Sequence, residues 1–101
     1  MEIIVPLKEI EVTEGEKVTL TCEVNRPDVK AKWFKDNVEI KSTEARVLTV
    51  DGCQHTLTLP AAELDDEAEY TIKLEDKSSK ALVLVNGMMS LFSITQSSYM
   101  N

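Results

Sequence analysis

Hydrophobic and polar residues alternate along most of this chain with a period of two, the pattern of β-strands with one buried face. The clearest run covers residues 18–24, where every second residue is apolar. Further runs predict strands at residues 3–7, 10–13, 31–34, 38–40, 47–50, 53–59, 68–74 and 81–85. No helical period persists along the chain, so the pattern predicts an all-β fold in which two sheets pack face to face.

Turn residues separate the predicted strands. Pro6 has no backbone N–H, so it predicts either an edge strand or a break between two half-strands at residues 3–7 and 10–13. Asp36-Asn37 and Asp51-Gly52 predict tight hairpin turns, because these residue types tolerate a positive φ. A turn is also predicted at residues 76–79, and a short helical turn at residues 60–64.

The end of the chain differs from the rest. Residues 86–101 contain no charged residue, whereas 29% of the whole chain is charged, and they keep neither a helical nor a strand period. We therefore predict one domain at residues 1–86 and an uncharged tail at residues 87–101 outside it. A chain of 101 residues is long enough for one hydrophobic core and too short for two.

The charge balance narrows the classes of partner. Lys and Arg number 11 against 18 Asp and Glu, which gives a net charge of −7. This balance argues against nucleic acid and against an anionic membrane surface, both of which require a basic face. We also expect no signal peptide and no membrane span, because the longest apolar run of a strand is residues 81–85.

A few residues, far apart in the sequence, mark the predicted centre of the sandwich. Cys22 lies within the strand at 18–24, and Trp33 follows eleven residues later. The motif Asp66-x-Ala-x-Tyr70-x-Ile72 lies further along the chain. An indole that bridges two sheets buries a large area, so we expect Trp33 to pack in the core rather than to stack on a ligand. The predicted core residues are Cys22, Trp33, Leu57, Leu59, Tyr70 and Ile72.

These motifs resemble those of intermediate-set (I-set) immunoglobulin domains. The likeness is strongest to the tandem modules of giant muscle proteins such as titin, and extends to obscurin, myosin-binding protein C, myomesin and palladin. It rests on residues 12–22, 32–40, 55–59 and 66–72, within a similar stretch at about 3–85. The resemblance implies an immunoglobulin-like Greek-key sandwich with a tyrosine corner, in which the Tyr70 hydroxyl bonds to backbone near residues 64–66.

Ile72 stands where immunoglobulin domains usually carry their second disulfide cysteine. We therefore expect Cys22 and Cys53 to be free thiols and the domain to belong in a reducing compartment, the cytoplasm of a sarcomere or cytoskeleton. Asn37 departs from the glycine usual at its turn in the family, which does little harm.

Candidate chemistry is sparse. Arg46 and Asp66 are a plausible ion pair that closes one end of the sandwich. Five acidic residues within 63–69 raise the question of calcium, but they lack the spacing of a dedicated loop, so a solvated acidic end is preferred and weak calcium binding stays open. Cys53 and His55 share a strand face without a third group to orient them, so we predict no catalytic site, no metal centre and no cofactor.

The resemblance implies a structural module that resists force in a long chain of similar modules. The predicted mechanical clamp is a row of backbone bonds between residues 10–13 and 81–85, with Ile10, Val12, Val83 and Val85 as its core, and a proline at Val83 is expected to weaken it. The implied partners are neighbouring immunoglobulin-like domains and sarcomeric or cytoskeletal proteins, with the module itself monomeric. The alternative is a binding module that recognises a protein through a sheet face or its loops.

Overall fold

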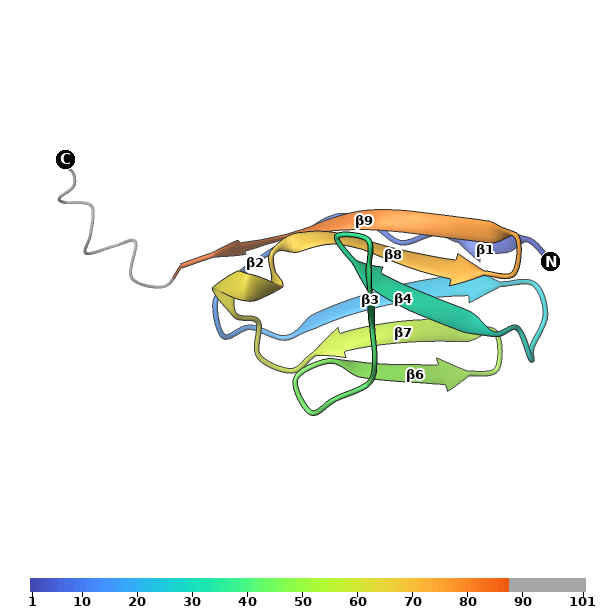
Figure 1. Cartoon of the computed structure of the whole chain (residues 1–101), viewed down its shortest axis with the longest axis horizontal. Coiled ribbons are helices and arrows are strands. Elements are labelled where there is room, and N and C mark those ends of the chain that lie inside the picture. The colour runs from blue at the N-terminus through green and yellow to red at the C-terminus, as the bar shows by residue number, and fades with distance from the viewer. Residues whose placement is uncertain (88–101) are drawn as a thin grey trace, which may run out of the picture.

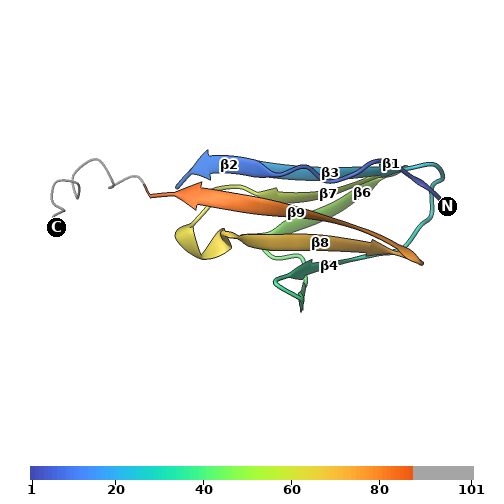
Figure 2. The ribbon, with the colours of Figure 1, turned by 90° about the horizontal axis from the view of Figure 1, so that it is seen from above.

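The structure, a computed structural model, describes residues 1–87 of the 101 and contains two packed sheets (Figures 1 and 2). The four-stranded sheet has the order β1 (Ile3–Val5), β3 (Val18–Val24), β7 (Gln54–Leu59), β6 (Val47–Asp51). The five-stranded sheet has the order β2 (Ile10–Thr13), β9 (Lys77–Asn86), β8 (Ala68–Leu74), β4 (Ala31–Lys35), β5 (Val38–Ile40).

The predicted all-β immunoglobulin-like architecture is confirmed. One short 3-10 helix, η1 (Leu64–Asp66), is the only helix in the part of the chain that the structure describes. No helix within residues 1–87 is long and apolar enough to cross a membrane. The tail predicted at 87–101 lies outside the described residues except for Gly87.

The core forms where the inward faces of the two sheets meet. Alternate residues of β3 are almost fully buried, as the period of two predicts. Trp33 on β4 stands directly opposite Ile72 on β8, and their exposed fractions are 4% and 0%. Cys22, on the other sheet, is also 0% exposed and belongs to the same buried cluster. Leu57, Leu59 and Tyr70 complete the predicted set, and each is 0% exposed.

The chain crosses from one sheet to the other at Pro6. Before this residue β1 pairs with β3, and after it β2 pairs with β9 in the other sheet. The buried Leu7 anchors the crossing, and its N–H donates to the Ser79 hydroxyl at 2.9 Å. The predicted break between two half-strands is therefore observed, and β1 is also an edge strand of its sheet, so both interpretations of Pro6 hold.

One of the two predicted hairpin turns has the expected position and the other is shifted by one residue. Asp36 and Asn37 both adopt positive φ, 48° and 71°, as a tight two-residue hairpin turn requires. The next hairpin turns at Gly52-Cys53 instead of Asp51-Gly52, because Asp51 already pairs with a residue of β7. Gly52 has φ +62° at the first turn position, where glycine is favoured, and Cys53 consequently precedes the strand.

Two further boundaries differ from the sequence prediction. The turn predicted at 76–79 is tighter, because Glu75 takes a left-handed φ of 57° and β9 begins already at Lys77. The helical turn predicted at 60–64 forms at Leu64–Asp66. It starts later because the Asp66 carboxylate accepts the backbone N–H of Glu63 and so caps the helix at that residue.

Truncation of Ile72 tests the apolar plug at the missing disulfide position. We expect Ile72→Ala to lower the free energy of unfolding by about 2–5 kcal/mol, because it leaves a cavity between the sheets. The control Val50→Ala shortens an apolar side chain that is 62% exposed and should cost less than about 0.5 kcal/mol. Urea denaturation measures both, and equal losses would contradict the placement of Ile72 at the centre of the core.

Candidate functional site: the paired terminal strands and the capped end

The terminal strands β2 and β9 form a parallel ladder. Its register joins Ile10 to Val83 and Val12 to Val85, and then Thr13 to Asn86. One bond extends the ladder past β2, since the N–H of Glu14 donates to the Asn86 carbonyl at 2.7 Å. Figure 2 shows both arrows pointing towards the same end of the domain. The structure thus brings together the four residues predicted as a clamp.

Successive backbone N–H groups of a strand point to opposite sides, and the hydrogen bonds at the ends of β2 and β9 show which side each group faces. The N–H of Glu14 faces β9, whereas that of Thr13 donates to the Glu16 carboxylate at 2.8 Å. On β9, the N–H of Val85 donates to the Glu67 carboxylate at 3.0 Å, on the β8 side. Val12 therefore points its N–H at β9, and Glu11 does not.

The same alternation corrects one expectation. Val83 has the parity of Val85, so its N–H faces β8 rather than β2. A proline at Val83 would remove a bond from the β8–β9 pair and would not test the terminal ladder. The sequence contains no signal for this distinction, because both choices place the same side chains in the core.

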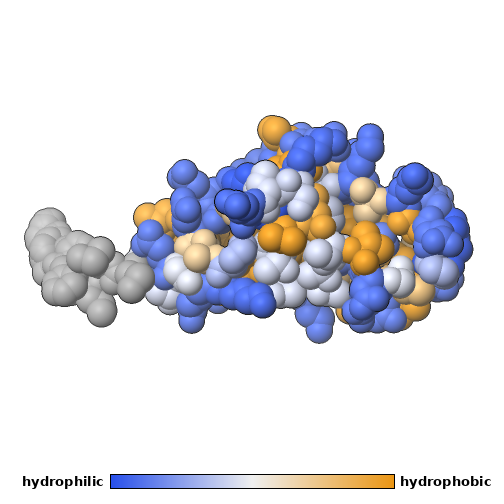
Figure 3. Space-filling view, turned by 90° about the horizontal axis from the view of Figure 1, so that it is seen from below, coloured by the Kyte–Doolittle hydropathy of each residue, from blue (hydrophilic) through white to orange (hydrophobic). Residues whose placement is uncertain are grey.

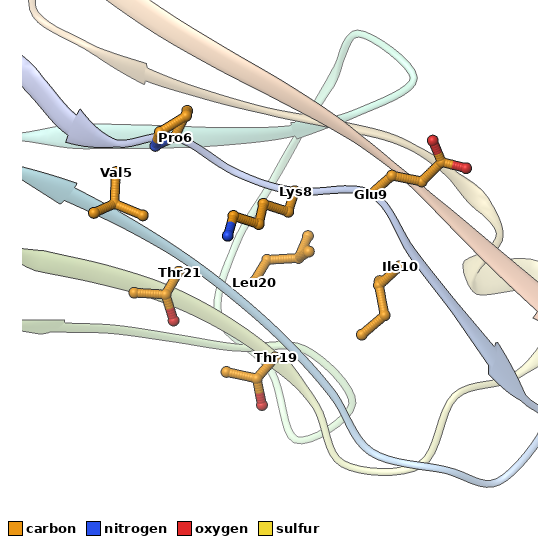
Figure 4. A pocket seen from close by; sticks show the side chains of 8 residues that line it. All are labelled: Val5, Pro6, Lys8, Glu9, Ile10, Thr19, Leu20 and Thr21. Atoms are coloured by element: carbon orange, nitrogen blue, oxygen red, sulfur yellow. The ribbon is translucent and has the colours of Figure 1, made fainter.

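A hollow of about 290 Å³ lies where the chain changes sheets (Figure 4). Leu20, only 2% exposed, lies among its lining residues, and Lys8 and Ile10 point towards β3 whereas Glu9 points away. The hollow is the space left between β3 and the crossing segment. Its one cation and one carboxylate come from neighbouring residues that point apart, so it presents no convergent polar groups for a ligand.

Asp66 organises the end of the sandwich at which β9 finishes. Its carboxylate accepts the N–H of Glu63 at 2.9 Å, and its carbonyl accepts the Tyr70 hydroxyl at 2.6 Å. Burial raises the pKa of Tyr70 to about 12, and the nearby Asp66 charge acts in the same direction. The tyrosine-corner geometry expected from the family resemblance is thus present.

The Arg46 guanidinium approaches the same carboxylate less closely. Its Nη2 lies 3.4 Å from Asp66 Oδ1, and its buried Nε has no hydrogen-bond partner among the described residues. The contact is long, and although the Asp66 side chain is only 10% exposed, the Arg46 side chain is 29% exposed, so water reaches the guanidinium and weakens the pair. The backbone bonds of Asp66 therefore hold the loop more strongly than the ion pair does.

The acidic residues of 63–69 do not converge on a common point. Asp66 points inward, Glu67 accepts the N–H of Val85, and the carbonyl of Asp65 accepts the Lys35 ammonium. Within residues 1–87 no group of three or more His, Cys, Asp or Glu side chains is arranged to hold a metal ion. Calcium binding at this end therefore gains no support from the geometry.

His55, the single histidine of the chain, lies in the core. It is 0% exposed, stands opposite Cys22 on the neighbouring strand, and neither ring nitrogen has a hydrogen-bond partner among residues 1–87. Burial lowers the pKa of His55 and raises the pKa of the Cys22 thiol, so both side chains are uncharged. Both cysteines are free thiols, as predicted, and Cys53 is half-buried in the turn.

Removal of the Tyr70 hydroxyl tests the capped end. Tyr70→Phe leaves the Asp66 carbonyl unpaired in a buried position, so we expect a loss of about 1–3 kcal/mol in the free energy of unfolding. Arg46→Ala breaks only a long, screened contact and should cost less. Urea denaturation measures both variants, and a larger loss for Arg46→Ala would show that the ion pair holds this end.

Acidification should unfold the domain through His55. The folded state lowers the pKa of this ring below the unfolded value of about 6.5, so the unfolded chain binds the proton more readily. The stabilisation is present above that pH and is lost as the pH falls through the folded-state pKa. His55→Leu should flatten the pH dependence of the urea midpoint between about pH 7 and pH 5, since the chain has no other histidine.

Comparison with known proteins identifies the family. The family described as Immunoglobulin I-set domain matches residues 1–85. Titin of Drosophila melanogaster is 34% identical over 84 residues, 83% of this chain. Fast-type myosin-binding protein C of Mus musculus is 34% identical over 67 residues, 66% of this chain. The chain spans only 0% and 6% of these two proteins, to the nearest per cent.

Solved structures agree with this match. Domain I10 from titin is 32% identical, with a TM-score of 0.80, over 84% of this chain and 97% of that domain. The Ig-like domain of human obscurin-like protein 1 is 34% identical, with a TM-score of 0.78, over 85% of each chain. A sandwich with this strand order, register and tyrosine corner, matched over nearly all its described residues, belongs to the immunoglobulin I-set domain family.

Proposed function

We propose that this chain is a non-enzymatic mechanical and scaffolding module of a multidomain sarcomeric or cytoskeletal protein. The observation that carries the proposal is the parallel pairing of β2 with β9 in a domain whose N-terminus and β9 end lie at opposite ends (Figure 1). The similarity to titin and myosin-binding protein C supports the setting. Its neighbours would be similar domains, and its compartment the cytoplasm, where free thiols persist.

The direction of pulling relative to the strands decides how the ladder fails. Force that enters at the N-terminus draws β2 one way along its axis, and force that leaves through β9 draws that strand the other way. The two strands are therefore loaded in shear, and all bonds between them must lengthen together. Each bond contributes only about 0.5–1.5 kcal/mol net, so simultaneous loading rather than the strength of single bonds gives the resistance.

The short strand β1 provides a weaker first step. Only two residue pairs join it to β3, and a register irregularity separates them. The crossing at Pro6 makes β1 and β2 separate units, so β1 can detach from one sheet while β2 stays paired in the other. The same pull therefore reaches the β2–β9 ladder only after the first pairing has opened.

A proline pair on β2 tests the ladder with a built-in control. Val12→Pro deletes an N–H that faces β9, whereas Glu11→Pro deletes one that faces away from it. We expect Val12→Pro to lower the unfolding force in single-molecule pulling, and Glu11→Pro to leave it close to that of the unmodified domain. Val12→Ala, which keeps the N–H and shortens the side chain, separates lost packing from the lost bond.

Two results would contradict the proposal. Equal unfolding forces for the two proline variants would show that the β2–β9 bonds do not set the resistance. A force for Val12→Ala as low as that for Val12→Pro would assign the resistance to side-chain packing. Thermal unfolding by circular dichroism, measured on the same samples, confirms that each variant is folded before it is pulled.

A further inference from the structure

The outer face of the five-stranded sheet carries an unusual group of cations. Lys32 on β4 and Lys73 on β8 stand directly opposite each other, on strands about 4.8 Å apart. They line a hollow of about 580 Å³ that we call the lysine hollow. Its lining residues are Lys30, Ala31, Lys32, Glu39, Lys41, Lys73 and Glu75. Four cations therefore gather at one place in a chain whose net charge is −7.

The two carboxylates in the lysine hollow already have partners. Glu39 pairs with Lys41 at 2.9 Å, and Glu75 accepts Arg26 from outside the hollow at 2.7 Å. No carboxylate oxygen of residues 1–87 lies within 4.0 Å of the ammonium nitrogen of Lys30, Lys32 or Lys73, so these lysines form no ion pair there. Like charges directly opposite each other on a sheet are unfavourable, so an anion placed between these ammonium groups would relieve a repulsion.

An aromatic ring orients one of the cations. The Lys73 ammonium lies over the Phe34 ring, 5.1 Å from its centre, which fixes the direction of this long side chain. Phe34 is half-buried and lies on the same face of β4 as Lys32, so an apolar ring lies next to the lysine hollow. On the face of the domain seen in Figure 3, the hydrophobic areas are small and separated by hydrophilic ones. No extensive apolar docking surface is visible there.

The pKa of Glu39 shows how the lysines around the hollow act on a carboxylate. Its pKa is lowered mainly by the hydrogen bond from Lys41; desolvation opposes this, and the charges of Lys41 and Lys32 add smaller lowering effects. A carboxylate at the edge of the lysine hollow is thus stabilised in its ionised form. The carboxylate of a partner, placed between Lys32 and Lys73, would likewise be stabilised by cations, neither of which forms an ion pair among residues 1–87.

We propose that the lysine hollow is a docking site for an acidic segment of another protein. Two or three carboxylates spaced about 5–6 Å apart, as at positions i and i+4 of a helix, match the separation of the lysine-bearing strands. Each would bridge ammonium groups that now repel. The inference goes beyond the mechanical role and does not depend on the β2–β9 ladder, which lies at the other edge of the same sheet.

The negative charge of the rest of the domain favours a short protein segment over a nucleic acid or a membrane as the partner. Double-stranded DNA carries a phosphate charge about every 1.7 Å, so most of its charges would lie over the acidic remainder of this domain. An anionic membrane presents an equally extended field. A short acidic segment confines its charge to the hollow, within the Debye length of about 8 Å at physiological salt.

Titration followed by nuclear magnetic resonance tests this proposal. The probe is an alanine-based helical peptide with glutamates at i and i+4, and its control replaces those glutamates by glutamine. We expect saturable shifts confined to the amides of β4, β5 and β8, and weaker binding at higher salt. The double variant K32Q/K73Q should weaken binding at least about tenfold. The matched variant K8Q/K17Q removes the same charge from exposed lysines elsewhere and should change it less than about twofold.

Several outcomes would overturn the proposal. Equal effects of the two double variants would reduce the binding to non-specific charge attraction. Binding of the glutamine peptide would remove the role of carboxylates. Tighter binding of single-stranded DNA or of phosphatidylserine vesicles to the same lysines would assign the hollow to another class of partner. K32Q/K73Q relieves a like-charge pair but gives up the contact of Lys73 with Phe34, so its melting temperature should stay close to that of the unmodified domain, and circular dichroism at the titration temperature separates a loss of binding from a loss of folding.

Discussion

The pairing of β2 with β9 is the constraint on which the arrangement of the terminal segments depends. It draws the chain out of one sheet after β1 and into the other, and Pro6 supplies the break that this change of sheet requires. The buried Leu7 and its bond to Ser79 hold the crossing in place. Because β2 and β9 run in the same direction, the two ends of the domain leave from opposite ends of the sandwich (Figure 1). The shear loading that we propose for the domain rests on this one pairing.

Much of the fold can be predicted from the sequence, because period-two patterning reports directly which side chains are buried. The strand around Cys22, the turn at Asp36-Asn37 and the core position of Trp33 all follow from residue type and spacing. The boundaries at Gly52-Cys53 and Glu75 do not, since a turn can shift by one residue without changing the inward pattern of its strands. Such choices are made by the register within each hairpin, between β6 and β7 and between β8 and β9, which the alternation along one strand does not reveal.

In the candidate sites too, some features could be predicted from the sequence and others could not. The hydrogen bond from Tyr70 to Asp66 could be predicted because a family motif specifies it. The structure adds that Asp66 also caps η1. The direction of each N–H on β2 and β9 could not be predicted from the sequence, because it depends on which alternate residues of a strand bond to the partner strand. The lysine hollow was missed because Lys32 and Lys73 are far apart in sequence. Their outward positions were visible in the alternation, but their alignment across two strands was not.

Ile72 has a consequence for the length that this domain can release. In a sandwich with a covalent bond between its sheets, the segment enclosed by the two cysteines stays looped when the fold opens. Positions 22 and 72 are 50 residues apart, so such a loop would withhold about 165–180 Å of extended chain. With an aliphatic side chain and a free thiol in these places, nothing tethers that segment. Once the fold opens, every residue between the first and last strands can contribute to the reach of the chain.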